Sequence, residues 1–174
     1  HKNLLTLIEA FKVFSKENES FTLVLAGQLA ENLIGGSEEY KRKLIEAIGS
    51  TPNIVVTGYV DDQCLGALYE NCSLFVFPSV FEGFGMPPVE AMGFGCPVIT
   101  TKCASLPEVT LNSAIYVEDP YDAGELCGKI NMVVNNLSCY RKDFEAKAQL
   151  IKDHYSPTVI SEKYGNVFLS VIEK

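Results

Sequence analysis

Apolar positions along this chain follow two different periods. Five short, continuous apolar runs, rich in β-branched residues, are separated by segments in which apolar residues recur every three or four positions. The first pattern is typical of strands buried on both faces, and the second is typical of amphipathic helices. The predicted strands are Phe21–Ala26, Asn53–Thr57, Leu74–Phe77, Pro97–Thr100 and Ala114–Val117. The alternation predicts a doubly wound α/β fold, with a parallel sheet flanked by helices.

Polar residues at the helix starts support this assignment. Helices are expected at Asn3–Lys16, after Ser37, before Leu74, after Pro87, at Ala123–Asn135, at Cys139–Lys152 and after Ser156. The predicted caps are Ser37 after the Gly35-Gly36 turn, Asp61 or Asp62, Ser105 in a capping box with Glu108, and Ser156 before Pro157.

Composition narrows the class of function. The 174 residues suit one domain, and no apolar run approaches the roughly 18 residues of a membrane span. The net charge of −8 argues against a nucleic-acid surface, which needs clustered Lys and Arg. Any phosphate in a ligand must therefore be held by a local site.

The six cysteines lack a CxxC pair, and each lies in or beside an apolar stretch. We expect buried thiols of a cytoplasmic protein, because such cysteines behave as small hydrophobic residues. With two histidines and widely spaced cysteines, the sequence offers no zinc pattern, and it has no GxSxG motif of a hydrolase.

The candidate chemistry is concentrated in the segment Ser79–Met92, between the third predicted strand and a helix that begins near Pro87. Gly83 and Gly85 remove the Cβ atoms that would keep a ligand from the backbone. The helix start adds free amides and partial positive charge. This combination predicts a site for an anion.

Two carboxylates indicate that the ligand of this site is more than a simple anion. Glu82 lies in the loop, and Glu90 follows in the first turn or so of the helix. Ionised carboxylates only accept hydrogen bonds, so the ligand must also offer hydroxyl groups. A molecule that carries both phosphates and sugar hydroxyls meets both requirements.

Read together, the motifs resemble the C-terminal domain of a family-4, GT-B-fold retaining glycosyltransferase, which has a Rossmann-like fold. The resemblance covers nearly the whole chain. It rests on Lys2-Asn3, Leu25-Ala26-Gly27, Gly58-Tyr59-Val60, Pro78-Ser79, Glu82-Gly83-Phe84-Gly85, Glu90-Ala91-Met92, Pro97-Val98-Ile99 and Leu106-Pro107-Glu108.

The resemblance implies a role for each motif. Glu82 would face the transferred sugar, Lys2 would touch the diphosphate leaving group, and Glu90 would accept hydrogen bonds from the ribose. Residues 1–174 would then form a nucleotide-sugar-binding domain. The remaining implied contacts to the donor are Gly27 at the diphosphate, Tyr59 and Val60 at the nucleobase, and Gly83, Phe84, Gly85 and Met86 at sugar and phosphate oxygens.

The implied reaction transfers a sugar from a UDP- or GDP-linked donor to an acceptor hydroxyl, with retention of anomeric configuration. The resemblance implies no metal and no cofactor beyond the donor substrate. Family frequency favours bacterial cell-surface polysaccharide or lipopolysaccharide synthesis. The expected location is cytoplasmic, with any attachment to the inner face of the plasma membrane made through another domain.

Two parts of the family pattern lie outside this sequence: an N-terminal acceptor-binding domain and a strand immediately before Lys2. In a doubly wound sheet, that strand lies between those at Phe21–Ala26 and Leu74–Phe77. We therefore expect these two strands not to pair directly, and we expect this chain alone to be inactive as a transferase.

Other interpretations of the same residues stay open. Glu82 and Lys2 can be solvated charges, Glu90 can simply favour the helix dipole, and Tyr59 and Val60 can pack at a sheet edge. A rival function is a non-catalytic doubly wound module that binds a nucleotide or a protein. An enzymatic rival is a phosphorylase of the glycogen type or a sucrose-phosphate-type enzyme.

Overall fold

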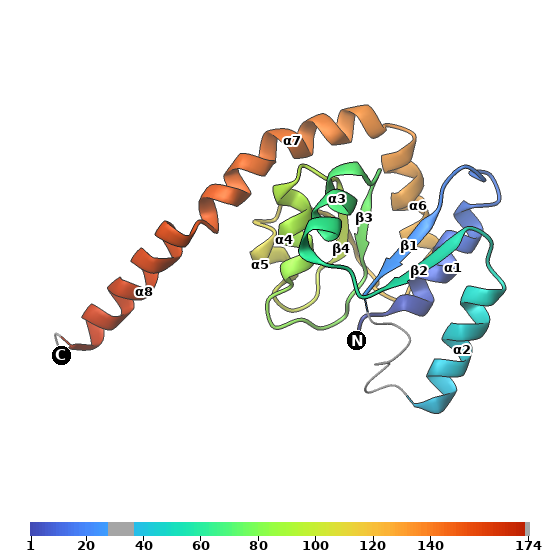
Figure 1. The fold of residues 1–174 in the computed structure, drawn as a ribbon, viewed down its shortest axis with the longest axis horizontal. Helices are drawn as coiled ribbons and strands as arrows, with labels where there is room; N and C mark the ends of the chain where they lie inside the picture. Colours follow the sequence, from blue (N-terminus) through green and yellow to red (C-terminus); the bar gives the residue numbers. More distant parts are fainter. Residues whose placement is uncertain (28–36, 173–174) are drawn as a thin grey trace.

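All five predicted strands are present in the structure, a computed structural model that describes residues 1–27 and 37–172 (Figure 1). The observed bounds lie within two residues of the expected ones. The strands are β1 Leu23–Ala26, β2 Ile54–Gly58, β3 Phe75–Phe77, β4 Val98–Thr101 and β5 Ile115–Val117.

The helices also follow the predicted order. They are α1 Leu4–Phe14, α2 Glu38–Gly49, α3 Asp62–Asn71, α4 Met86–Gly93, α5 Leu106–Val109, α6 Ala123–Val134, α7 Leu137–His154 and α8 Pro157–Ile172. Ser37 caps α2 by accepting a hydrogen bond from the amide of Tyr40, and Asp61 caps α3 through the amide of Cys64. The predicted Gly35-Gly36 turn lies outside the described residues.

The strands are parallel but form two separate sheets. β1 pairs with β2, and β3, β4 and β5 form the second sheet in that order. Within residues 1–27 and 37–172, β1 and β3 are not paired, so the expectation that Phe21–Ala26 does not pair with Leu74–Phe77 is confirmed. The strand expected between them stays a prediction.

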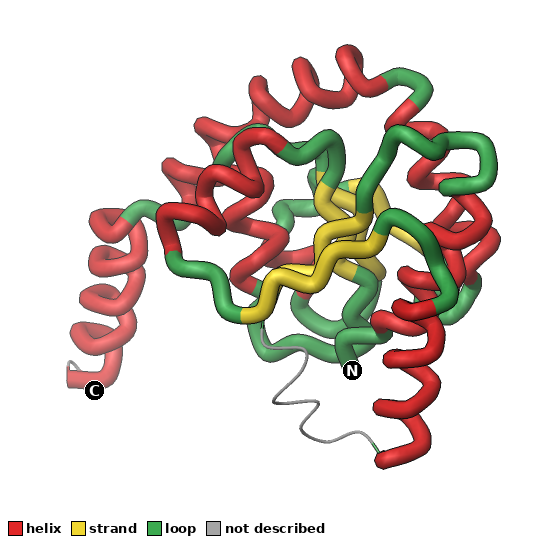
Figure 2. The backbone as a smooth tube through the Cα atoms, turned by 45° about the vertical axis from the view of Figure 1, so that its right-hand side comes forward, coloured by secondary structure: helices red, strands yellow, loops and turns green. Residues whose placement is uncertain are grey.

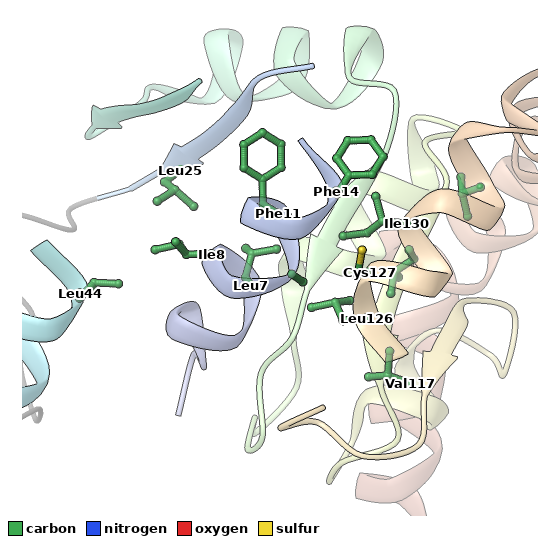
Figure 3. Close-up of a cluster of buried hydrophobic side chains, with 13 residues drawn as sticks. Leu7, Ile8, Phe11, Phe14, Leu25, Leu44, Val117, Leu126, Cys127 and Ile130 are labelled. Atoms are coloured by element: carbon green, nitrogen blue, oxygen red, sulfur yellow. The ribbon is translucent and has the colours of Figure 1, made fainter. Parts of the chain in front are cut away.

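Helices surround the strands on both faces (Figure 2). On one face, α1 and α6 pack together over the strands with Leu7, Phe11 and Ile130, as Figure 3 shows. A second hydrophobic cluster joins α3, α4 and α7. Ile99 of β4 belongs to the first cluster and its neighbour Val98 to the second, because successive strand residues point to opposite faces.

The last helix, α8, has no buried residue and extends away from the rest of the fold (Figure 1). It exposes the apolar side chains of Val167, Phe168, Leu169, Val171 and Ile172. Among the described residues, no helix is both long enough and apolar enough to cross a membrane.

The expectation that all cysteines are buried is wrong for two of them. Cys64 on α3 and Cys139 on α7 are exposed, whereas Cys96 and Cys127 are buried. Apolar neighbours in the sequence did not predict burial, because adjacent positions of a helix point in different directions. Cys72 and Cys103 are half-buried.

Candidate functional site

Lys2 and Glu82 meet at the end of β3. The Nζ atom of Lys2 lies 2.7 Å from Oε1 of Glu82, and 5.0 Å from the ring centroid of Phe77. The Glu82 side chain is 13% exposed and that of Lys2 is 47% exposed. The carboxylate is thus largely enclosed, whereas the ammonium-bearing side chain is about half exposed.

The residues around Lys2 are tied to two loops. The carbonyl oxygen of His1 accepts a hydrogen bond from the Val80 amide, at 2.9 Å, and lies 3.0 Å from the hydroxyl oxygen of Ser79. The Asn3 side chain donates to the carbonyl oxygens of Pro78 and Pro120. Asn3 itself adopts a left-handed conformation, φ 53°, which asparagine tolerates better than most residues.

Ser79 connects the beginning of the chain with Glu82. It is fully buried, and its Oγ lies 2.6 Å from the same Glu82 oxygen that pairs with Lys2. Thr101 of β4 holds the Ser79 carbonyl with a 2.6 Å hydrogen bond. Two hydrogen-bond donors, Lys2 and Ser79, therefore hold the Oε1 atom of Glu82.

The loop before α4 offers backbone donors. Pro87 and Pro88 occupy the first turn of α4 and have no N–H group, so the donors must come from earlier positions. In the described part of the chain, no backbone carbonyl accepts a hydrogen bond from the amides of residues 83–86. Gly83, Phe84 and Met86 are exposed, so their amides are available to oxygen atoms of a ligand, whereas Gly85 is buried.

Ser105 supports this loop rather than a helix start. Its hydroxyl approaches the carbonyl oxygens of Phe84, at 2.8 Å, and of Glu82, at 3.2 Å. It makes no capping bond at α5, so the predicted capping box with Glu108 is wrong. The long-range contact with the loop competes successfully with the local capping interaction.

The two loop glycines have different constraints. Gly85 has φ 93°, and a Cβ atom there would lie 2.8 Å from the Leu106 side chain. A Cβ atom on Gly83 would meet no atom of the described residues within 4 Å. Gly85 is thus required by conformation and packing, whereas Gly83 leaves open space of the kind expected for close approach of a ligand.

Glu90 is held from another helix. Its Oε2 atom accepts a hydrogen bond of 3.1 Å from the hydroxyl of Tyr69, on α3. Burial, followed by the nearby Glu90 carboxylate, raises the pKa of Tyr69 above its ordinary value, so the hydroxyl keeps its proton and donates.

Tyr59 and Val60 lie beside a hollow of about 540 Å³ between the end of β2 and α3. Tyr59 is 75% exposed, and Asp61, Cys64 and Leu68 complete part of the wall. At the same edge, the amide of Gly27 donates to the carbonyl of Gly58 across 2.9 Å. The hollow is open and partly apolar, which suits a flat ring.

The structure thus brings Lys2, Glu82 and the glycine loop together, and it places Tyr59 and Val60 at a common hollow. Sequence reasoning missed the supporting roles of Ser79, Ser105 and Tyr69. Ser79 belongs to the motif Pro78-Ser79 and Ser105 directly precedes Leu106-Pro107-Glu108, so both were marked by a usable sequence signal. Among the described residues, no group of three potential metal-binding side chains is present; the absence of a metal from the reaction stays a prediction.

Comparison with known proteins gives a consistent set of matches. The family profile described as "Glycosyl transferases group 1" matches residues 1–151. The serotype-specific mannosyltransferase WbdA of Escherichia coli is 33% identical over 144 residues, which are 81% of this chain and 17% of that protein. The chain therefore spans a small part of that relative.

Two solved structures show the same fold. HepE of Anabaena, in complex with UDP-glucose, superimposes with a TM-score of 0.81 at 20% identity, covering 97% of this chain and 45% of HepE. The C-terminal domain of the group 1 glycosyl transferase LpcC from Francisella tularensis has a TM-score of 0.72 at 26% identity. That match covers 90% of this chain and 80% of the solved domain.

Proposed function

The chain belongs to the group 1 glycosyltransferase family, and we propose that it binds a nucleoside diphosphate sugar as the donor-binding part of a retaining transferase. The observation that carries the proposal is the Lys2–Glu82 pair beside a loop with free amides. This arrangement offers positive charge and N–H donors for phosphates, together with a carboxylate acceptor for sugar hydroxyls.

In the proposed reaction, the bond between the anomeric carbon and the diphosphate oxygen breaks, and the acceptor oxygen forms a new bond to that carbon. Glu82 binds a sugar hydroxyl and stabilises the positive charge that develops at the anomeric carbon. Lys2 and the amides of Gly83, Phe84 and Met86 stabilise the negative charge of the departing diphosphate, which takes the proton of the acceptor hydroxyl. No metal or separate cofactor is needed in this scheme.

The rest of the donor occupies the neighbouring strand ends. We assign the ribose hydroxyls to Glu90 and the nucleobase to the hollow beside Tyr59 and Val60. Gly27 lets the backbone approach the diphosphate, because it has no Cβ atom and, among the residues that the structure describes, nothing lies within 4 Å of where one would be.

The names of relatives suggest the sugar and the process. Besides WbdA, they include an O-antigen chain mannosyltransferase of Escherichia coli and the capsular polysaccharide glycosyltransferase CapM of Staphylococcus aureus. We therefore propose hexosyl transfer in the synthesis of a cell-surface polysaccharide or lipopolysaccharide, on the cytoplasmic side. Mannose is the first sugar to test.

Acceptor binding is assigned to a second, N-terminal domain. The chain spans 17% of WbdA and 44% of CapM, so these relatives contain much more than the matched part. The exposed apolar face of α8 offers a surface for such a domain. On this proposal, the 174 residues alone bind the donor but do not transfer sugar.

Calorimetry with UDP and GDP tests the binding claim on the full-length protein. We expect heat of binding with one of the two nucleotides, and weaker binding by the Glu90→Ala variant. Absence of binding to both nucleotides in a folded sample would refute the proposal. Assays with a panel of UDP- and GDP-linked sugars then identify the donor, and dependence of turnover on Glu82 separates a transferase from a binding module.

A further inference from the structure

A buried tyrosine reaches one of the proposed donor contacts. Tyr69 is 4% exposed, and its ring packs edge-on against Phe75 of β3 and at a tilt against Phe94, directly after α4. The ring centroids lie 5.3 and 6.0 Å apart, respectively. Two aromatic neighbours on separate elements thus fix where the hydroxyl group of Tyr69 lies.

The hydroxyl donates to one oxygen of Glu90, at 3.1 Å. Within residues 1–27 and 37–172, no other side chain donates to this carboxylate, and no Lys or Arg pairs with it. An ionised carboxylate has about four lone-pair sites, so most of its capacity is left for other donors. The Oε1 atom in particular has no donor from these residues.

The same helix also forms part of the hollow assigned to the nucleobase. Cys64, Ala67 and Leu68 of α3 line that hollow, and Tyr69 is the next residue along the helix. One rigid element therefore contributes both to the base-binding wall and to the orientation of the ribose-binding carboxylate.

We propose that Tyr69 is a positioning residue for donor binding, which holds Glu90 so that its free oxygen accepts the ribose hydroxyls. The inference rests on the proposed function, because it needs Glu90 to bind ribose. A carboxylate held in place by a second residue loses less conformational freedom on binding than a freely rotating one. Tyr69 itself makes no contact with the ligand in this scheme.

The test compares Tyr69→Phe with the wild type in the full-length protein, by calorimetry with UDP and GDP. The variant keeps the ring and its packing and loses only the hydroxyl. We expect the dissociation constant of the nucleotide that binds to rise about tenfold, as for loss of one hydrogen bond to a charged group. Tyr116→Phe is the matched control, because it removes a hydroxyl bonded to Thr110 and should leave affinity unchanged.

A nucleotide without ribose hydroxyls distinguishes the positioning of Glu90 from a purely structural role of Tyr69. With the 2′,3′-dideoxy analogue of the same nucleotide, Tyr69→Phe and the wild type should bind equally, and adding Tyr69→Phe to Glu90→Ala should cause no further loss. Unchanged affinity for the normal nucleotide, or an equal loss for the dideoxy analogue, would overturn the role of Tyr69 alone. If the wild type binds neither nucleotide, the proposed function itself fails.

Discussion

Lys2 and Glu82 are eighty positions apart in the sequence, yet Nζ of the lysine lies 2.7 Å from Oε1 of the glutamate. The family resemblance of the sequence implies that Glu82 faces the transferred sugar and that Lys2 touches the leaving diphosphate. A partly exposed ion pair of this kind contributes little to stability, about 0–1 kcal/mol. Its position beside the glycine loop therefore points to chemistry rather than to folding.

The first prediction concerns the charge of Glu82. Glu82→Gln keeps the size of the side chain but removes the negative charge that would stabilise the anomeric carbon. In the full-length protein, we expect kcat to fall by about 10²–10³-fold, with little change in nucleotide affinity by calorimetry. Glu118→Gln, which breaks the exposed Lys102–Glu118 pair, should leave kcat unchanged. A Glu82→Gln enzyme with normal kcat would contradict the assigned role.

The second prediction tests whether Lys2 contacts the outer phosphate of the nucleoside diphosphate. Lys2→Met keeps an aliphatic chain beside Phe77 but removes the positive charge. We expect binding of the nucleoside diphosphate to weaken about tenfold, while binding of the monophosphate changes much less. Lys102→Met is the control, since its ammonium group pairs with Glu118 outside the site. Equal losses for both nucleotides would argue against a contact with the outer phosphate.

Much of the fold could be predicted because its signals are local. The strands are continuous apolar runs, and Ser37 and Asp61 cap the helices that follow them. The capping-box prediction failed because a long-range contact replaced the local one. Ser105 lies in a capping-box pattern, but its hydroxyl bonds the carbonyl of Phe84, 21 positions away.

The site residues also fall into two groups: those that a local sequence pattern predicts and those that depend on long-range packing. The motif residues Glu82 and Glu90 could be found by their spacing beside glycines and a helix start. The residue that supports Glu90 could not be predicted, because Tyr69 reaches Glu90 only through the packing of α3 against α4. No local pattern marks such a tyrosine as different from an ordinary core aromatic residue.

The third prediction uses the two loop glycines as a matched pair. Gly85→Ala forces a Cβ atom into a left-handed backbone and against Leu106, at 2.8 Å. We expect the free energy of unfolding to fall by about 1–3 kcal/mol, measured by urea denaturation.

Gly83→Ala serves as its counterpart, because a Cβ atom there meets nothing within 4 Å in the part of the chain that the structure describes. Its stability should stay within about 0.5 kcal/mol of the wild type, whereas donor binding should weaken if the sugar or phosphate occupies that space. Equal destabilisation by both substitutions would show that the left-handed conformation of Gly85 does not cause the loss of stability.

The fourth prediction concerns two free thiols near Tyr69. The Sγ atoms of Cys72 and Cys96 lie 3.0 Å apart, and the carbonyl of Cys72 accepts a hydrogen bond from Arg141. The hydrogen bond from Cys96, with the positive charge of Arg141 adding to it, lowers the pKa of Cys72 below its ordinary value. We therefore expect Cys72 to be the nucleophile of the pair, with a thiolate that persists to lower pH than that of a typical cysteine.

We expect the azo oxidant diamide to convert this pair to a disulfide, taking up the two electrons and two protons that the thiols release. Peptide mapping by mass spectrometry should show the Cys72–Cys96 link, and its rate of formation should fall as the pH drops through the pKa of Cys72. Closing 24 residues into a loop should stabilise the fold by about 3 kcal/mol if the geometry is unstrained. Cys72→Ser should abolish the link, whereas Cys64→Ser, at an exposed thiol, should not. Recovery of Cys72 and Cys96 as separate free thiols, under conditions that oxidise the exposed cysteines, would contradict the prediction.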